Sequence, residues 1–190
     1  MATTYNWGVV TGDICEVNCD VVVNAANTVM LGGGGVDGAI HTAAGKRMVK
    51  YIRKFIKPIG VDRIDPTAKV RLDYGDVEIT PAFSMKNCKA VIHTVGPIWH
   101  GGKLGECNTL CRCYYNCLDM AKAWGFKSIA FPSISTGCFK FPMPLAVELA
   151  THCVKHWQEV NGRGLKVVFV AHDDETYEQY ESMMKFREGR

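Results

Sequence analysis

Two short runs of apolar residues constrain the fold most strongly, because no polar residue interrupts them: Val21–Val23 and Val167–Val170. A strand with one face in water alternates apolar and polar side chains, whereas a strand covered on both faces is apolar throughout. Such runs are typical of central strands in a sheet that lies between two layers of helices. Together with the other β-rich segments, they predict strands at Trp7–Thr11, Val21–Ala25, Asp76–Thr80, Ala90–Val95, Ser128–Phe131 and Lys166–Ala171.

Segments with helical periodicity separate these strands. They predict helices at Val36–Ala44 with a continuation to about Lys57, at Leu104–Trp124, at Pro144–Val160 and at Glu175–Phe186. Alternating strands and helices indicate an α/β fold with a largely parallel sheet and helices on both of its faces. No internal repeat, low-complexity tract or linker divides the sequence, so we expect a single domain over residues 1–190.

The composition is typical of a folded domain with little net charge. Hydrophobic residues make up 47% of the 190 residues, which is too many for a disordered chain. No apolar run is long enough to span a membrane, and the polar N-terminal stretch Met1–Asn18 does not resemble a secretory signal. The 22 basic and 19 acidic residues leave a net charge of +3, which argues against a nucleic-acid partner. The basic segment Lys46–Lys57 is interpreted as a solvated helix face, with a surface for a polyanion as the alternative.

The sequence contains nine cysteines. An odd number without a secretory signal indicates reduced thiols in an intracellular, cytoplasmic protein. Cys107 and Cys111 share one face of a predicted helix, and Cys113 and Cys117 share a face turned by roughly 160–240° from the first. The two pairs therefore cannot close one metal site, and they lack the C-x-x-C spacing typical of zinc. We expect no metal, and interpret these residues as small apolar side chains packed on both sides of a buried helix.

Four consecutive glycines, Gly32–Gly35, lie between a predicted strand and a predicted helix, and Gly38 follows them. Without a Cβ atom, glycine lets backbone N–H groups approach a ligand closely. The adjacent helix N-terminus adds unpaired N–H donors and the positive end of the helix dipole. This combination predicts an anion site, most naturally for a phosphate group, with a flexible connection as the alternative.

A second loop of the same kind, Ser133–Phe139, also joins a strand to a helix. Ligands of open α/β sheets bind beyond the carboxyl ends of the strands, so the two loops could hold a diphosphate between them. Gly33, Gly35 and Gly38 also match the dinucleotide pattern G-x-G-x-x-G. That pattern requires a tight turn directly after the strand, whereas eight residues intervene between Val23 and Gly32. A hydride-transfer enzyme is therefore not favoured.

Several segments in a fixed order carry a resemblance to a known family. They are Gly12-Asp13-Ile14, Val23-Asn24-Ala25-Ala26-Asn27, Leu31 to His41, Ala43-Ala44-Gly45, His93-Thr94-Val95-Gly96-Pro97 and Pro132 to Gly137. On these residues the sequence resembles the macrodomain family, specifically its MacroD-like branch, which hydrolyses ADP-ribosyl esters. The resemblance extends over nearly the whole chain. It implies a three-layer α/β/α sandwich with a mixed, mostly parallel central sheet.

The resemblance also implies an ADP-ribose site. Asp13 and Ile14 would bind the adenine, the two glycine-containing loops would bind the diphosphate, and Phe139 would pack near the distal ribose. The alternatives are that Asp13 is a turn-forming residue and that Phe139 packs in the core. The implied ligand-binding residues are Asp13, Ile14, Asn24, Gly33, Gly34, Gly35, Val36, Ser135, Thr136, Gly137, Cys138 and Phe139.

The catalytic residues that the resemblance implies are Asn27, Asp37 and His41. Asp37 and His41 are four residues apart, so a helix places them on one face. Asn27 has both a donor and an acceptor, and Asp37 is suited to orient or deprotonate a water. His41 would hold Asp37 or the ribose, although a lone histidine is also a common structural residue.

These residues predict a hydrolase that removes mono-ADP-ribose from acidic side chains, or deacetylates O-acetyl-ADP-ribose, without a cofactor. The alternative is a module that only binds ADP-ribose. We expect the partners to be ADP-ribose and mono-ADP-ribosylated proteins, and the protein to be a monomer without membrane contact. One departure from the family lies at Lys140, which occupies a position where a glycine is usual.

Overall fold

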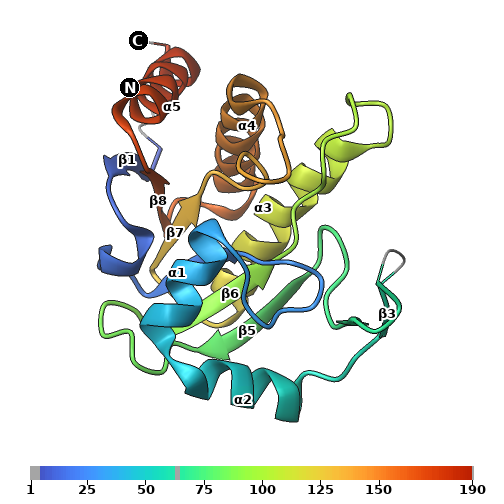
Figure 1. The fold of residues 1–190 in the computed structure, drawn as a ribbon. Coiled ribbons are helices and arrows are strands. Elements are labelled where there is room, and N and C mark those ends of the chain that lie inside the picture. The colour runs from blue at the N-terminus through green and yellow to red at the C-terminus, as the bar shows by residue number, and fades with distance from the viewer. Residues whose placement is uncertain (1–4, 63–64, 190) are drawn as a thin grey trace.

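The structure is a computed structural model that describes residues 5–62 and 65–189, so the first four residues of Met1–Asn18 lie outside it. Its centre is a six-stranded sheet in the order β1-β8-β7-β2-β6-β5 (Figure 1). In this sheet β5 pairs with β6 in the antiparallel direction, and the other neighbours are parallel. The strands are β1 (Trp7–Thr11), β2 (Val21–Ala25), β5 (Val77–Pro81), β6 (Ala90–Thr94), β7 (Ser128–Pro132) and β8 (Lys166–Ala171).

Helices cover both faces of this sheet (Figure 1). One face packs against α1 (Gly35–Ala44), α2 (Lys46–Phe55) and the short 3-10 helix η1 (Ile14–Glu16). The other face packs against α3 (Glu106–Ala123), α4 (Met143–Asn161) and α5 (Asp174–Glu188). This is the three-layer arrangement with a mixed, mostly parallel sheet that the sequence predicts.

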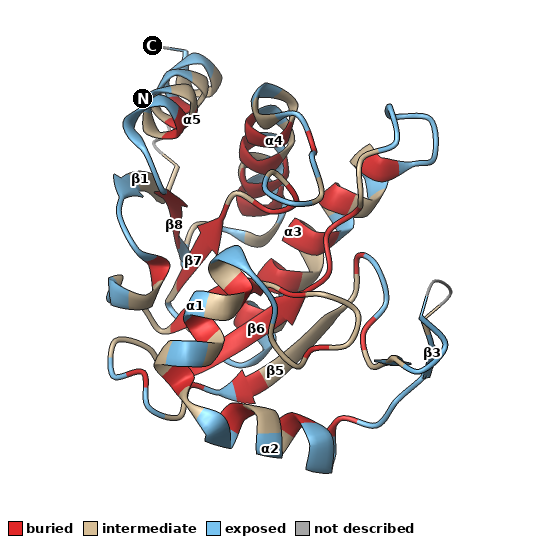
Figure 2. Ribbon diagram, in the orientation of Figure 1, coloured by how far each residue is buried: buried red, intermediate tan, exposed pale blue. Residues whose placement is uncertain are grey.

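The uninterrupted apolar strands supply the cores on both sides. In β2, Val21 and Val23 face the α3–α5 layer while Val22 faces the α1–α2 layer, and all three are fully buried. In β8, Phe169 likewise faces the α3–α5 layer and Val170 faces the α1–α2 layer. Figure 2 shows β6, β7 and β8 largely buried and the edge strand β5 less so. The prediction from the apolar runs is therefore confirmed.

The predicted helix from Val36 to about Lys57 is wrong in one respect, because the structure has two helices there. Gly45 has a φ of 77°, which a helix cannot contain. The Gly45 N–H closes α1 on the carbonyl of His41, and the Gly45 carbonyl accepts the Met48 N–H as α2 begins. The sequence also did not reveal a two-stranded antiparallel sheet formed by β3 (Gly60–Val61) and β4 (Lys69–Val70).

The cysteines of α3 pack as expected. Cys113 and Cys117 are fully buried, and Cys107 and Cys111 are half-buried against the same apolar cluster. Within residues 5–62 and 65–189, no group of three or more His, Cys, Asp or Glu side chains is placed to hold a metal ion. None of the helices in that part of the chain has the length and apolar character needed to cross a membrane.

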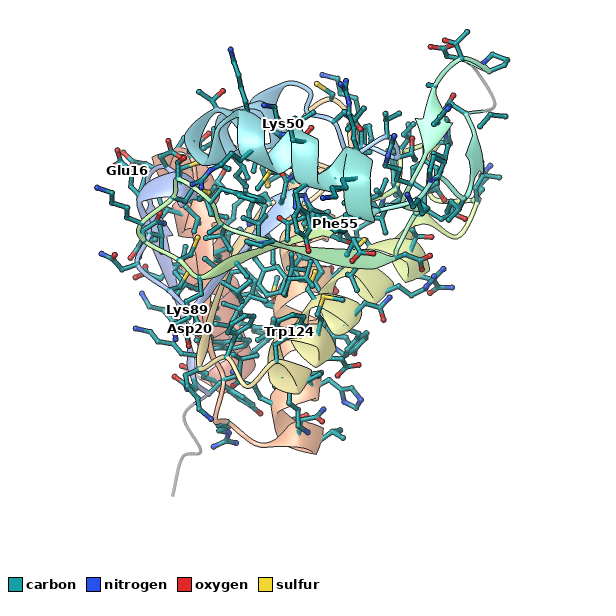
Figure 3. All side chains as sticks on the ribbon, turned by 90° about the horizontal axis from the view of Figure 1, so that it is seen from below. Glu16, Asp20, Lys50, Phe55, Lys89 and Trp124 are labelled. Atoms are coloured by element: carbon teal, nitrogen blue, oxygen red, sulfur yellow. The ribbon has the colours of Figure 1, made fainter. Side chains whose placement is uncertain are left out.

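The basic segment forms the outer face of α2, which crosses the near side of the molecule in Figure 3 with Lys50 and Phe55 marked on it. Its cationic side chains are all exposed: Lys46, Arg47, Lys50, Arg53, Lys54 and Lys57. The buried face of the same helix carries Met48 and Ile52. Elsewhere on this side, Lys89 pairs with Asp20 at 2.6 Å (Figure 3).

Candidate active site

A cavity of about 270 Å³ lies where the loops that follow β2 and β7 meet, at the carboxyl edge of the sheet. The first loop connects β2 to α1, and the second connects β7 to α4. The cavity is lined by Ala25, Ala26, Asn27, Gly33, Gly34, Gly35, Val36, Asp37, Gly96, Ser135, Gly137, Cys138 and Phe139. Both glycine-containing loops that the sequence singles out therefore border the same cavity.

The first loop leaves the N-terminus of α1 open to the cavity. Gly34 precedes the helix without a side chain to cap it, so N–H groups of the first turn stay available to a ligand. Gly35 has a φ of 58°, which favours glycine. A Cβ atom on Gly38 would lie 2.6 Å from the carbonyl oxygen of Gly33, so this glycine lets the loop fold back on its helix.

The second loop is held from both ends. The Phe141 N–H donates to the carbonyl of Ser135 at 3.0 Å, and the Trp99 N–H donates to the carbonyl of Phe139 at 2.8 Å. Ser135 has a φ of 68° and is buried, with its Oγ lacking a partner within the described residues. A Cβ atom on Gly96 would overlap that Oγ, which explains the glycine just after β6.

Lys140 has a backbone conformation that favours glycine. Its φ is 58°, and its N–H donates to the carbonyl of Gly137 at 3.0 Å. The side chain is exposed and does not line the cavity. The loop therefore closes in spite of Lys140, with backbone strain at that residue.

Asp37 lies in the first turn of α1 and is 4% exposed. Its Oδ1 accepts a 2.6 Å hydrogen bond from Asn24 Nδ2, whereas its Oδ2 is buried without a partner among the described residues. Burial raises the pKa of Asp37 above its ordinary value, and the Asn24 hydrogen bond and the nearby His41 partly oppose this effect. A carboxylate with a raised pKa is a stronger base than an exposed one.

Asp37 and Asn27 both pack closely against Gly33, where a larger residue would crowd them. A Cβ atom on Gly33 would lie 3.0 Å from Asp37 Oδ2 and 3.1 Å from Asn27 Nδ2. The free carboxylate oxygen and an amide nitrogen therefore both lie against Gly33. Asn27 and Asp37 both line the cavity, so a donor and an acceptor lie close to each other at its wall.

Most of the hydrogen-bonding capacity of the Asn27 side chain is already used within the protein. Its Oδ1 already accepts the N–H groups of Val29 and Met30 at 3.1 and 2.9 Å, and its Nδ2 donates to the Gly32 carbonyl at 3.1 Å. An amide oxygen has two lone pairs and an amide nitrogen has two hydrogens. Only one N–H of Asn27 therefore remains for a ligand, and the acceptor expected from the sequence is occupied.

His41 lies beside Asp37 but does not line the cavity. Its Nε2 is 3.4 Å from Asp37 Oδ1, and neither ring nitrogen has a hydrogen-bond partner in the described part of the chain. Burial lowers the pKa of His41 below its ordinary value, and the Asp37 carboxylate partly opposes this. The ring also packs under Gly32, whose Cβ atom would lie 3.4 Å from His41 Cγ.

Asn24 is fully buried and does not line the cavity, although the sequence suggested a ligand contact. Its Nδ2 contacts both Asp37 Oδ1 and His93 Nδ1, the latter at 3.0 Å. The other ring nitrogen of His93 lies 3.0 Å from the hydroxyl of Thr80. Burial lowers the pKa of His93 to about 3, with a smaller effect of nearby His41, so this ring is neutral at pH 7.

Asp13 and Ile14 follow β1, two strands away from β7 in the sheet. Asp13 is exposed, and its Oδ1 caps η1 by accepting the Cys15 N–H at 2.8 Å. The Gly12 N–H donates to the carbonyl of Ala171, which fixes this segment beside the end of β8. Asp13 thus has the turn-forming role that the sequence allowed, and it also lies at the same edge of the sheet as the cavity.

The structure brings most of the predicted site residues together and separates five from the cavity. Those that do not line it are Asp13, Ile14, Asn24, His41 and Thr136. The cavity also includes Ala25, Ala26 and Gly96, which the sequence did not assign to the site. His93 and Thr80 were missed because nothing in their own segments indicates that they contact Asn24.

Comparisons with known proteins agree with this fold. The model of the family described as Macro domain matches residues 23–150. A macro domain-containing protein of Listeria monocytogenes is 42% identical over 178 residues, which cover 93% of this chain and 95% of the relative. An O-acetyl-ADP-ribose deacetylase of Citrobacter koseri is 41% identical over 173 residues, covering 91% and 92%.

Two solved structures have the same fold. The Oceanobacillus iheyensis macrodomain with ADP superposes with a TM-score of 0.85 at 35% identity, covering 98% of this chain and 94% of that one. The Trypanosoma brucei macrodomain in complex with ADP-ribose superposes with a TM-score of 0.79 at 29% identity, covering 93% and 68%. By its sequence and its fold, this chain belongs to the Macro domain family.

Proposed function

We propose that the cavity binds ADP-ribose and that the protein hydrolyses ADP-ribosyl esters. The observation that carries this proposal is the buried carboxylate of Asp37, which lines a cavity between two glycine-containing loops and keeps Oδ2 without a partner among the described residues. A module that only binds ADP-ribose needs the loops but does not need this base. The deacetylase among the relatives and the solved relatives with ADP and ADP-ribose support the proposal.

In this proposal the diphosphate lies between the two loops and the adenine lies near Asp13. The open N-terminus of α1 supplies backbone donors and the positive end of a helix dipole to the phosphates. Phe139 packs near the distal ribose, which extends toward Asn27 and Asp37. The adenine end uses the oxygen of Asp13 that the cap of η1 leaves available.

A water between Asn27 and Asp37 is the proposed nucleophile. The remaining N–H of Asn27 orients it, Asp37 Oδ2 accepts its proton, and a substrate phosphate oxygen shares the positioning. The water oxygen displaces the side-chain carboxylate from C1″ of carboxylate-linked ADP-ribose, so that the C1″–O bond to the side chain breaks. In O-acetyl-ADP-ribose it adds to the acetyl carbonyl, the bond from the acetyl carbon to the ribose oxygen breaks, the ribose oxygen takes the proton held by Asp37, and acetate is released. Loop N–H groups stabilise the negative charge that develops.

Two substrates test whether the protein is an enzyme. The wild-type protein is incubated with O-acetyl-ADP-ribose and with a protein that carries mono-ADP-ribose on a glutamate, and ADP-ribose and acetate release are measured. We expect release from at least one of these esters. Tight ADP-ribose binding without release from either would disprove the hydrolase and leave the binding module.

A substitution at Gly137 tests the loop assignment. Gly137 lines the cavity, a Cβ atom added to it would meet no neighbour within 4 Å, and it does not need a positive φ, so a new side chain fits the fold. We expect Gly137→Glu to weaken ADP-ribose binding by about 100-fold or more through charge and bulk, and Gly137→Ala to weaken it far less. Gly164→Glu, at an equally open glycine, is the charge control. An unchanged titration of Gly137→Glu with ADP-ribose would contradict the assignment.

A further inference from the structure

Three buried polar side chains from adjacent strands form a continuous path that ends at Asp37. Thr80 of β5 is 1% exposed, and His93 of β6 and Asn24 of β2 are fully buried. Asn24 and His93 are direct neighbours in the parallel pairing of β2 with β6. Buried polar side chains are costly unless they are hydrogen-bonded, so a path of three beside a catalytic carboxylate calls for a function.

The hydrogens along this path follow from the donors that are available. Asn24 Nδ2 has two hydrogens and two partners, Asp37 Oδ1 at 2.6 Å and His93 Nδ1 at 3.0 Å. Because the amide nitrogen can only donate, His93 Nδ1 must accept. The ring proton therefore lies on Nε2, which donates to the Thr80 hydroxyl at 3.0 Å. One tautomer of His93 satisfies both contacts.

We propose that Asn24, His93 and Thr80 are positioning residues that hold the Asp37 carboxylate with Oδ2 toward the cavity. Asn24 determines the tautomer of His93, Thr80 accepts the Nε2 proton and holds the ring, and Asn24 also occupies Asp37 Oδ1. Oδ2 is then left without a partner among the described residues, close to Gly33 and Asn27, and stays available to the proposed water. This inference rests on the proposed hydrolase function, and it replaces the ligand contact expected of Asn24.

The path also sets the charge of Asp37. The Asn24 donor favours the ionised carboxylate and opposes the burial that raises its pKa. The other titratable groups that face Asp37 are His41 on its own helix and His93 on β6, and His93 stays neutral because burial lowers its pKa to about 3. Loss of the Asn24 donor would therefore raise the pKa of Asp37 further, so that the carboxyl group would keep its proton to a higher pH.

Two substitutions of His93 separate positioning from packing. The side-chain amide of His93→Asn reaches the place of Nδ1 and can accept from Asn24, whereas that of His93→Gln reaches the place of Nε2 and can donate to Thr80. We expect His93→Gln to lower kcat about 10- to 100-fold, the range typical of residues that orient a catalytic group. We also expect the acidic limb of its pH–rate profile to move to higher pH. His93→Asn should retain more activity, and both should bind ADP-ribose within about threefold of wild type.

Thr80 gives a second test that leaves His93 in place. Thr80→Val removes the hydroxyl and Thr80→Ser keeps it, so we expect only the valine variant to lower kcat and shift the pH profile. Thr151→Val is the matched control, since Thr151 is fully buried in α4 and its hydroxyl donates to the Val147 carbonyl away from the cavity. It should lower Tm without moving the pH profile.

A readout without turnover keeps this inference separate from the proposed function. NMR titration of the Asp37 carboxyl carbon reports its pKa directly, and we expect His93→Gln to raise that pKa relative to His93→Asn. Equal pKa values and equal kcat values in the two variants would overturn the positioning path. Absence of hydrolysis in the wild type, with the pKa difference still present, would instead overturn the proposed function alone.

Discussion

At the scale of single residues, the sequence identifies the chemistry better than it identifies the contacts. Asp37 and Asn27 come from a resemblance and lie together in the cavity. Asn24 comes from the same motif, but its side chain points into the α1 side of the sheet and is fully buried. The motif around Asn24 cannot reveal this buried contact, because His93, the partner of Asn24, lies on a strand about 70 residues away in the chain. The available signal is the strand period of two, which puts Asn24 on the same face as Val22.

The buried ring of His93 makes stability depend on pH. Burial lowers its pKa to about 3 from 6.5, so the unfolded chain binds a proton that the folded chain excludes between these values. The stability from His93 is therefore complete above about pH 6.5 and is lost as pH falls, by about 1.4 kcal/mol per pH unit.

Urea unfolding between about pH 7 and pH 4 measures this dependence. The wild type should lose stability more steeply than His93→Gln, whose side chain does not titrate. His100→Gln, at an exposed histidine, should have the wild-type slope. Equal slopes for the wild type and His93→Gln would show that the ring takes up its proton in the folded state.

At the scale of elements, the apolar runs and helical periods place the main strands and helices within a few residues of their observed bounds. The break at Gly45 was missed because the residues on both sides keep a helical period. The break matters for the site, since it ends α1 one turn after His41 and lets α2 turn away along β5. The two-residue strands β3 and β4 are too short to produce a pattern in the sequence.

Lys140 holds the second loop in a strained conformation, which predicts a stabilising substitution. A non-glycine residue at a φ of 58° costs about 1 kcal/mol, so Lys140→Gly should raise the free energy of unfolding by about that amount. Lys86→Gly is the control, because Lys86 is an exposed loop lysine without a positive φ. It should be neutral or destabilising. Thermal and urea unfolding measure both changes. Equal changes in the free energy of unfolding for Lys140→Gly and Lys86→Gly would contradict the strain at Lys140.

At the scale of the whole molecule, the strand order determines how a ligand can lie. The ends of β1, β8, β7 and β2 follow one another along one edge, because these strands are parallel neighbours. At about 4.8 Å per strand, Asp13 and the Asn27–Asp37 pair lie about 14 Å apart along that edge. This separation suits an elongated ligand with a different group at each end. The α/β class could be predicted from the sequence, whereas the antiparallel edge strand β5 could not, because its pattern does not encode its direction.

Asp13→Asn tests the far end of this arrangement. Asparagine keeps an oxygen that can cap η1 through the Cys15 N–H, but it replaces the second carboxylate oxygen with a donor. We expect ADP-ribose affinity to fall about tenfold with little change in Tm, since a hydrogen bond to a charged group contributes about 1.5–3 kcal/mol. Ribose 5-phosphate, which lacks adenine, should bind both proteins equally. An equal loss for both ligands would place the adenine elsewhere.

The central claim is that Asp37 acts as a base on water in a cavity that binds ADP-ribose through backbone groups. The most direct measurement is the rate of O-acetyl-ADP-ribose hydrolysis by Asp37→Asn, with ADP-ribose affinity determined by calorimetry on the same protein. We expect kcat to fall about 10²- to 10⁴-fold, while the affinity for ADP-ribose stays within about threefold of wild type. Undiminished hydrolysis, or a loss of affinity as large as the loss of rate, would contradict it.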